Sequence, residues 1–271
     1  MMTSTYEELK NIFIDSVDKS AYVELESAVY NYSVLESSLD KPLKMVLLYG
    51  KPGTGKSMLL NKLYHNLKEN REIHYFDAPI LSEKEFLKSI YEAMSGQAIP
   101  EKMRVNFDAL LKYCQKLRDK RELVFLLDEC QLYSEPLMEK IRLLSDTRVV
   151  KFVITLHKTE NEDVIAKEHF KTRIWEIIEM SNANEYDLEL YIQKKMIKKG
   201  FIDVSNNIKK RDIKYIHAQT KGNFRETNKY LYTVFDIYEY YERNEPEKIA
   251  DKKFSKKILE MAAIRLGYID E

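Results

Sequence analysis

The stretch MVLLYGKPGTGKS, residues 45–57, decides the fold of this chain. Its apolar first part stops at Gly50, and Gly55, Lys56 and Ser57 close the pattern G-x-x-x-x-G-K-[ST]. An apolar run precedes the pattern and apolar residues at helical spacing follow it, which is the strand-to-helix context of a phosphate-binding loop. In such a loop the backbone amides and the N-terminus of the following helix point at an anion. The alternative, an ordinary glycine-rich turn with one lysine, needs no such context.

Each residue type in this stretch has a chemical use. Gly50, Gly53 and Gly55 permit backbone angles that other residues avoid and let the main chain approach a ligand closely. The Lys56 ammonium is suited to the β- and γ-phosphates of a nucleotide, and the Ser57 hydroxyl to Mg²⁺. The residues expected to contact the nucleotide are Gly50, Lys51, Pro52, Gly53, Thr54, Gly55, Lys56, Ser57 and Met58.

Composition narrows the class of protein. Of the 271 residues, 44% are hydrophobic and 32% charged, which predicts a packed core. The formal net charge is zero, so bulk charge favours neither nucleic acid nor membrane as a partner. The two cysteines, Cys114 and Cys130, have no C-x-x-C spacing, which excludes a cysteine zinc site and fits a reducing compartment. Because there is neither a signal-peptide core nor an apolar run long enough to span a membrane, we expect a cytoplasmic protein.

Strands and helices are expected to alternate in the first two thirds of the chain. The run LVFLL is apolar on both faces, as strands of parallel sheets are. Ser82 and Glu85 form a capping box, and Ser134 with Pro136 begins another helix. The expected strands are 45–49, 72–76, 123–127, 149–156 and 174–178. The expected helices are 21–38, 55–70, 82–94, 107–120 and 134–145. This alternation predicts a doubly wound α/β domain with a five-stranded parallel sheet.

The pattern becomes helical after about Ser181. The expected helices there are 184–199, 208–219, 223–241 and 254–266. We therefore predict two domains, an αβα nucleotide-binding domain at 1–181 and a small all-α lid at 182–271.

Two acids follow the buried run LVFLL directly. An acid at the carboxyl end of a strand faces the crevice in which open α/β sheets bind ligands. We expect Asp128 to hold Mg²⁺ and Glu129 to orient or deprotonate the attacking water. Taken alone the two acids would also fit a solvated strand end.

Three further residues are candidates for reading the nucleotide. His157, with Thr155 before it, lies at the end of the fourth strand, where it would sense the γ-phosphate or be an ordinary strand end. Arg173, favoured over Lys171, is a candidate arginine finger for a neighbouring subunit, or a surface arginine. Arg225 begins the predicted lid helix 223–241, where it would contact nucleotide or make a local ion pair.

Four stretches carry a family resemblance. They are LLYGKPGTGKSMLL, LVFLLDECQLYSEPLMEKIRLLSD, HFKTRIWEI and TKGNFRETNKYL. In this order they resemble the AAA+ ATPases, and among those the ExeA-type ATPases of general secretion and pilus systems, whose relatives include the target-selecting ATPases of transposons. The resemblance covers roughly residues 20–266.

The resemblance implies Mg-ATP hydrolysis at subunit interfaces and ATP-dependent assembly of a homo-oligomer, a ring or a filament. Carried over by position, Lys56 and Ser57 bind phosphate and Mg²⁺, Asp128 and Glu129 are the acidic pair, Arg173 is the finger and Arg225 the lid sensor. This chain departs from the family at two points. The family usually has glutamine where this chain has His157. ExeA-type proteins also often continue into a membrane span, whereas this sequence ends at Glu271.

Three functions follow as alternatives. The first is an ATPase that couples assembly to a cell-envelope machine for secretion, a pilus or DNA uptake, with a protein partner at the inner membrane. The second is a DNA-binding ATPase that regulates transposition or replication. The third, motivated by His157, is a slow nucleotide switch.

Two surface features bear on partners. Lysines at i,i+4 spacing, at 194, 195, 198 and 199 and again at 252, 253, 256 and 257, predict a solvated face or a phosphate-binding patch. Five tyrosines and Phe235 crowd the predicted helix 223–241, so some are expected to pack inward and some to be partly exposed.

Overall fold

The computed structural model describes residues 4–15, 22–42, 44–100, 105–157, 173–249 and 254–269. By their internal contacts these form two compact units. The sheet unit comprises Val29–Lys51 and Lys56–Met180, and the helical unit comprises Met1–Ala28, Pro52–Gly55 and Ser181–Glu271. The sequence assigned residues 1–28 to the first domain, whereas their contacts are with the helical unit. A functional division into a nucleotide-binding domain and a lid stays a prediction.

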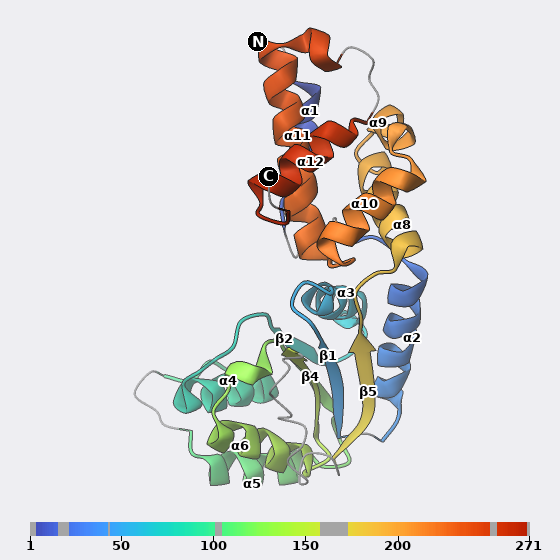
Figure 1. Cartoon of the computed structure of the whole chain (residues 1–271). Coiled ribbons are helices and arrows are strands. Elements are labelled where there is room, and N and C mark those ends of the chain that lie inside the picture. Colours follow the sequence, from blue (N-terminus) through green and yellow to red (C-terminus); the bar gives the residue numbers. More distant parts are fainter. Residues whose placement is uncertain are drawn as a thin grey trace. The chain divides into compact units, whose positions relative to one another are not determined.

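The sheet unit is built on one five-stranded sheet (Figure 1). Its strands are β1 Met45–Gly50, β2 Ile73–Phe76, β3 Leu123–Leu127, β4 Val150–His157 and β5 Ile174–Met180. Their order is β2-β3-β4-β1-β5, and every neighbouring pair is parallel. The predicted fold class is therefore confirmed, and all carboxyl ends of the strands lie at one edge of the sheet, the carboxyl edge.

Helices cover both faces of this sheet (Figure 1). They are α2 Glu26–Asp40, α3 Lys56–Leu67, α4 Glu83–Ser95, α5 Phe107–Leu117 and α6 Glu135–Ser145. Side chains of α4, α5 and α6 pack on one face, and side chains of α2 and α3 on the other. The central strand β1 alternates between them, since Met45 and Leu47 join the first cluster and Val46 and Leu48 the second. Burial on both faces explains why β1 is a continuous apolar run.

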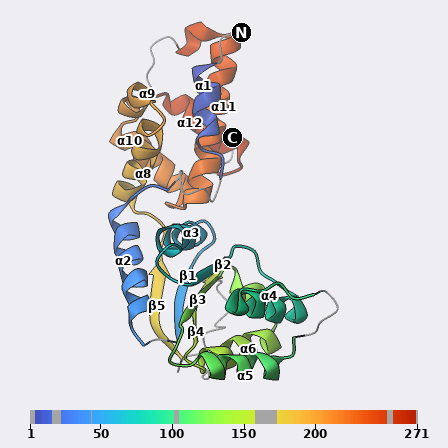
Figure 2. The ribbon, with the colours of Figure 1, turned by 180° about the vertical axis from the view of Figure 1, so that it is seen from behind.

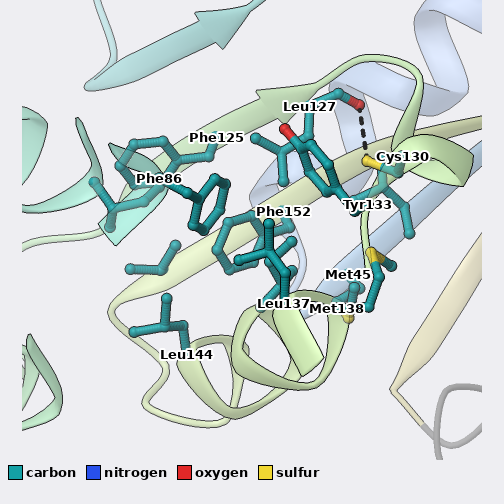
Figure 3. Packing of buried hydrophobic residues seen from close by; sticks show 14 of the residues in the cluster. Met45, Phe86, Phe125, Leu127, Cys130, Tyr133, Leu137, Met138, Leu144 and Phe152 are labelled. Atoms are coloured by element: carbon teal, nitrogen blue, oxygen red, sulfur yellow. Dashed lines mark hydrogen bonds between the residues drawn. The ribbon is translucent and has the colours of Figure 1, made fainter. Parts of the chain in front are cut away.

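The core under α4 to α6 is rich in aromatic rings (Figure 3). Phe125 and Phe152 on neighbouring strands have ring centroids 5.9 Å apart, and Phe86 of α4 meets Tyr133 edge-on at 5.7 Å. The Cys130 thiol donates to the Leu127 carbonyl at 3.4 Å, and burial raises the pKa of this thiol. Cys130 is therefore a packed, unreactive side chain.

Helices α4 and α6 begin directly after Ser82 and Ser134, as predicted, although the Ser134 side chain makes no capping hydrogen bond. The Ser82 hydroxyl accepts a hydrogen bond from the Glu85 amide, and α6 has a proline in its first turn. The predicted helix from residue 21 instead begins at Glu26. Leu25 packs in the core of the helical unit, and this tertiary contact overrides the helical spacing of the preceding residues.

The helical unit contains the predicted C-terminal helices and two short ones that periodicity did not reveal. Its helices are α1 Thr5–Asn11, α8 Glu185–Ile197, α9 Ile202–Asn207, α10 Lys210–Thr220, α11 Phe224–Asn244 and α12 Lys256–Arg265. Figure 2 shows α1 lying along α11, and the two helices make extensive contacts. With 7 and 6 residues, α1 and α9 are too short to show a helical period. No helix in the described ranges combines the length and apolarity that a membrane crossing requires.

Three lysines of the first cluster, Lys194, Lys198 and Lys199, are exposed, as a solvated face requires, and the fourth departs from that prediction. Lys195 is buried, and its ammonium donates to Tyr191 Oη at 3.1 Å and to Asn228 Oδ1 at 3.0 Å. Burial lowers the pKa of Lys195 to about 8, an effect that the nearby Asp15 charge opposes. Lys252 and Lys253 of the second cluster lie outside the described residues. The tyrosines divide as predicted: Tyr230 and Tyr238 are buried, and Tyr240 is exposed.

Candidate nucleotide-binding site

The loop after β1 is curled around its own lysine. Lys56, only 5% exposed, donates from Nζ to the carbonyl of Gly50 at 2.8 Å and to that of Lys51 at 2.9 Å. Gly53 and Gly55 have φ of 79° and 96°, a region in which only glycine is unstrained. The ammonium is therefore placed inside the loop, where an anion bound by the loop amides would meet a positive charge.

The loop also begins helix α3 at Lys56, so the first amides of this helix face the same space. Ser57 and Met58 are half-buried in its first turn, and Thr54 is buried in the loop. The Tyr75 hydroxyl at the end of β2 donates to the Ser57 carbonyl at 3.4 Å. Burial, followed by the charge of Asp128, raises the pKa of Tyr75, so this hydroxyl remains protonated and can donate. Tyr75 was not predicted from the sequence, because a tyrosine in a strand is an ordinary residue.

The acidic pair is fixed by Thr155 of the neighbouring strand. Asp128 is 3% exposed, and its Oδ1 accepts from the Thr155 hydroxyl and from the Glu129 amide, the latter at 3.0 Å. The Glu129 amide also donates to Thr155 Oγ1 at 2.9 Å. Glu129 itself has φ 52°, so these contacts hold a non-glycine residue in the left-handed region.

Strand register explains why the loop and the acids share one edge. Leu127 pairs with Ile154, which places Asp128 beside Thr155, and Gly50 pairs with His157. The structure therefore brings Gly50, Lys56, Asp128, Glu129 and His157 to the carboxyl edge, as the sequence predicts.

His157 is held by Gln131, a residue that the sequence did not single out. The Gln131 amide nitrogen and His157 Nδ1 are 3.2 Å apart, and the His157 backbone amide donates to Gln131 Oε1 at 3.4 Å. Gln131 follows the acidic pair by two residues, in a short 3₁₀ turn at Cys130–Leu132. The imidazole is thereby tied to the same turn that carries Glu129.

Arg173 lies at the opposite edge of the sheet. It directly precedes β5, whose first residue pairs with Met45, whereas the loop begins at Gly50, which pairs with Met180. Its guanidinium lies 3.4 Å from an Asp146 oxygen. Burial tends to raise the pKa of Asp146, but Lys44, Arg173 and Arg142 together bring it below its ordinary value.

Arg225 lies beside the tip of the loop, Pro52–Gly55, which belongs to the helical unit by its contacts. The Asn223 side chain donates to the Pro52 carbonyl at 2.7 Å while its oxygen caps α11, and the Phe224 amide donates to the Gly53 carbonyl at 3.1 Å. The Arg225 guanidinium pairs with Asp15 at 2.9 Å. The structure thus shows this helix-start arginine in an ion pair with a residue far away in the sequence rather than in a local one, and its contact with nucleotide stays a prediction. Asn223 was missed, although asparagine before a helical run is a cap signal.

These residues fit a magnesium nucleotide. Hydroxyl and carboxylate oxygens, from Ser57 and Asp128, are the donors that Mg²⁺ prefers. The glycines at 50, 53 and 55 carry no side chain that would obstruct a phosphate, and Lys56 supplies the charge.

Comparison with known proteins agrees with a nucleotide-binding α/β fold. Residues 41–164 match the family model described as AAA domain. Comparison with curated protein sequences gives no match. The chain superposes on Cdc6p from Pyrobaculum aerophilum with a TM-score of 0.62 at 17% identity, covering 86% of this chain and 67% of that one.

Two other solved structures are similar. The Aeropyrum pernix ORC1 protein in complex with DNA gives a TM-score of 0.60 at 16% identity, covering 95% of this chain and 69% of that one. A mutant of Thermotoga maritima RuvB gives 0.58 at 16% identity, covering 95% and 77%. At these identities the similarity is one of fold. The chain has the P-loop AAA+ fold, and its residues 41–164 match an AAA domain.

We predict that Gly53→Ala lowers the unfolding free energy of the helical unit by more than the cost of placing alanine at a positive φ. A Cβ on Gly53 would lie 2.3 Å from Asn223 Oδ1 and 2.8 Å from Arg225 Cβ. Gly200→Ala is the matched control, because Gly200 also has a positive φ, lies in the same unit and would meet no atom within 4 Å. The control should lose about 1 kcal/mol of unfolding free energy in a urea titration, and Gly53→Ala at least twice that. Equal losses would show that the loop tip does not pack against the start of α11.

Proposed function

We propose that this protein is an ATPase that binds Mg-ATP at the loop 50–57 and hydrolyses it. The observation that supports this most is the convergence of the Lys56 ammonium and the Asp128–Glu129 pair at the carboxyl edge of one sheet. Phosphoryl transfer to water requires positioning and charge neutralisation rather than covalent chemistry from the protein. The carboxyl edge offers groups suited to both.

Each group has a proposed role. Lys56 and the loop amides bind the phosphates. Ser57 and Asp128 would be ligands of the magnesium ion. When bound, this ion would neutralise charge that develops on the phosphates. Glu129 orients the water and accepts its proton. Thr155 fixes the acidic pair, and the proposed role of His157, which contacts Gln131, is to sense the γ-phosphate or the water.

A second copy of the chain is proposed to supply Arg173. The arginine and the loop are separated by the length of β5, the seven residues Ile174–Met180, or about 20 Å of strand. An arginine side chain is far shorter than this, so Arg173 does not reach the loop of its own chain. If Arg173 stabilises the transition state, it does so across an interface, and the active form is a homo-oligomer.

We consider two cellular processes for this ATPase, one linked to DNA and one at the cell envelope. The fold similarity to an ORC1 protein solved with DNA favours a DNA-linked ATPase, the second of the three alternatives. The burial of Lys195 removes one lysine from the face that would have contacted phosphate backbone. Coupling to a cell-envelope machine with a partner at the inner membrane, expected from the ExeA resemblance, stays a prediction. Retention of the protein on double-stranded DNA at low salt, stronger with ATP, separates the two.

Glu129→Gln should separate binding from hydrolysis. We expect the variant to bind Mg-ATP with wild-type affinity and to lose turnover by about 100-fold or more, because a general base contributes on that order. Phosphate release and equilibrium titration with Mg-ATP measure the two quantities. Wild-type turnover at the level of the Glu129→Gln variant would refute the ATPase and favour the slow nucleotide switch.

Mixing two inactive variants should restore activity. Lys56→Ala lacks nucleotide binding but retains Arg173, and Arg173→Ala retains the loop but lacks the finger. If Arg173 acts across an interface, a mixture regains turnover, because some interfaces combine an intact loop with an intact arginine. Lys44→Ala is the control for the loss of an Asp146 partner, since Lys44 contacts the other oxygen of that carboxylate. A mixture no more active than its components, or equal loss in Lys44→Ala, would contradict the proposal.

A further inference from the structure

Asp15, at the end of the N-terminal segment 4–15, forms an ion pair with Arg225 beside the loop tip Pro52–Gly55. Asp15 Oδ2 lies 2.9 Å from Arg225 Nε, and both side chains are more than half exposed. Asp15 and Arg225 are 210 residues apart in the sequence, so this contact is tertiary and depends on how the N-terminus is packed.

Several contacts hold that segment on α11. Lys10 forms ion pairs with Asp236 at 2.9 Å and Glu239 at 2.6 Å. Phe13, 1% exposed, stacks on Phe235 with ring centroids 5.6 Å apart. Asp15 follows the buried Phe13 by two residues, so the packing of Phe13 places the Asp15 carboxylate near the start of α11.

Arg225 is equally fixed at the base of its side chain. Its amide donates to the Asn223 cap at 3.1 Å, and the same cap holds the Pro52 carbonyl. Its Cβ is close enough to Gly53 that an added methyl group there would clash. A phosphate held by amides of the loop tip would therefore lie within the reach of this long side chain.

We propose that Asp15 competes with the nucleotide phosphate for Arg225. This inference rests on the proposed binding of nucleotide by the loop. An exposed ion pair is weak, whereas a phosphate offers a guanidinium two parallel charge-assisted hydrogen bonds. Arg225 therefore exchanges Asp15 for phosphate when nucleotide binds, and Asp15 lowers nucleotide affinity by occupying the arginine beforehand.

The same exchange links the nucleotide to the N-terminal segment. Coupling between two binding events is reciprocal, so a phosphate that removes Arg225 from Asp15 also releases Asp15 from the start of α11. The segment would respond to nucleotide without contacting it.

A double-mutant cycle on the full chain tests the competition. The dissociation constant for Mg-ATP is measured by titration calorimetry for wild type, Asp15→Asn, Arg225→Ala and the double variant, each also tested for unfolding free energy. Asp15→Asn should tighten binding about two- to fivefold, the range that an exposed ion pair allows. Arg225→Ala should weaken it, and in that background Asp15→Asn should have no effect.

Glu7→Gln is the matched control. Glu7 also joins the N-terminal segment to an arginine of α11, at 2.7 Å from Arg243, but Arg243 lies 18 residues beyond Arg225, about 27 Å along the helix. This control should leave the affinity unchanged.

Two results would overturn the inference while leaving the proposed function intact. One is an unchanged or weaker affinity in Asp15→Asn. The other is equal tightening with and without Arg225, which would indicate a general charge effect. A wild-type protein that binds no Mg-ATP would refute the proposed function itself, and the inference with it.

Discussion

The parallel pairing of β1 with β4 is the constraint on which the candidate site depends. Because Gly50 pairs with His157, the loop leaves the sheet beside the end of β4, and the pairing of β3 with β4 places Asp128 beside Thr155. Lys56, the acidic pair and His157 are far apart in the sequence. Only a sheet with all carboxyl ends at one edge gathers them, and burial of β1 on both faces keeps that register in place.

The loop is the second element on which the site depends, and its ends and its tip are held by different contacts. The Lys56 ammonium holds the two ends together by donating to the carbonyls of Gly50 and Lys51. The tip, Pro52–Gly55, is held by the Asn223 cap and the Phe224 amide at the start of α11. The Asp15–Arg225 pair adds a contact from the N-terminal segment to the residue beside this tip.

Much of the fold could be predicted because the signals are local. The run Leu123–Leu127 was predicted with its observed bounds, since an apolar pentapeptide followed by two acids leaves little ambiguity. The phosphate-binding loop, the cap at Ser82 and the proline of α6 are also local patterns. At the class level, the AAA+ resemblance agrees with the fold and with the AAA domain match, whereas the narrower ExeA resemblance stays a prediction.

What the sequence could not reveal depends on contacts between distant residues. Helices α1 and α9 are too short for a period, and Lys195 looks solvated until Tyr191 and Asn228 enclose it. Gln131 and Tyr75 have ordinary neighbours in the sequence, and only the fold brings them to His157 and Ser57. Arg173 was correctly placed before a strand, but only the sheet shows that it lies at the edge opposite its own loop.

We propose that the loop around Lys56, together with Asp128, forms a magnesium nucleotide site. The affinity of the wild-type chain for ATP, measured with and without Mg²⁺ beside Lys56→Ala and Asp128→Asn, tests this site. We expect binding that is strengthened by Mg²⁺ in the wild type, lost in Lys56→Ala and insensitive to Mg²⁺ in Asp128→Asn. Equal affinity in wild type and Lys56→Ala would contradict it.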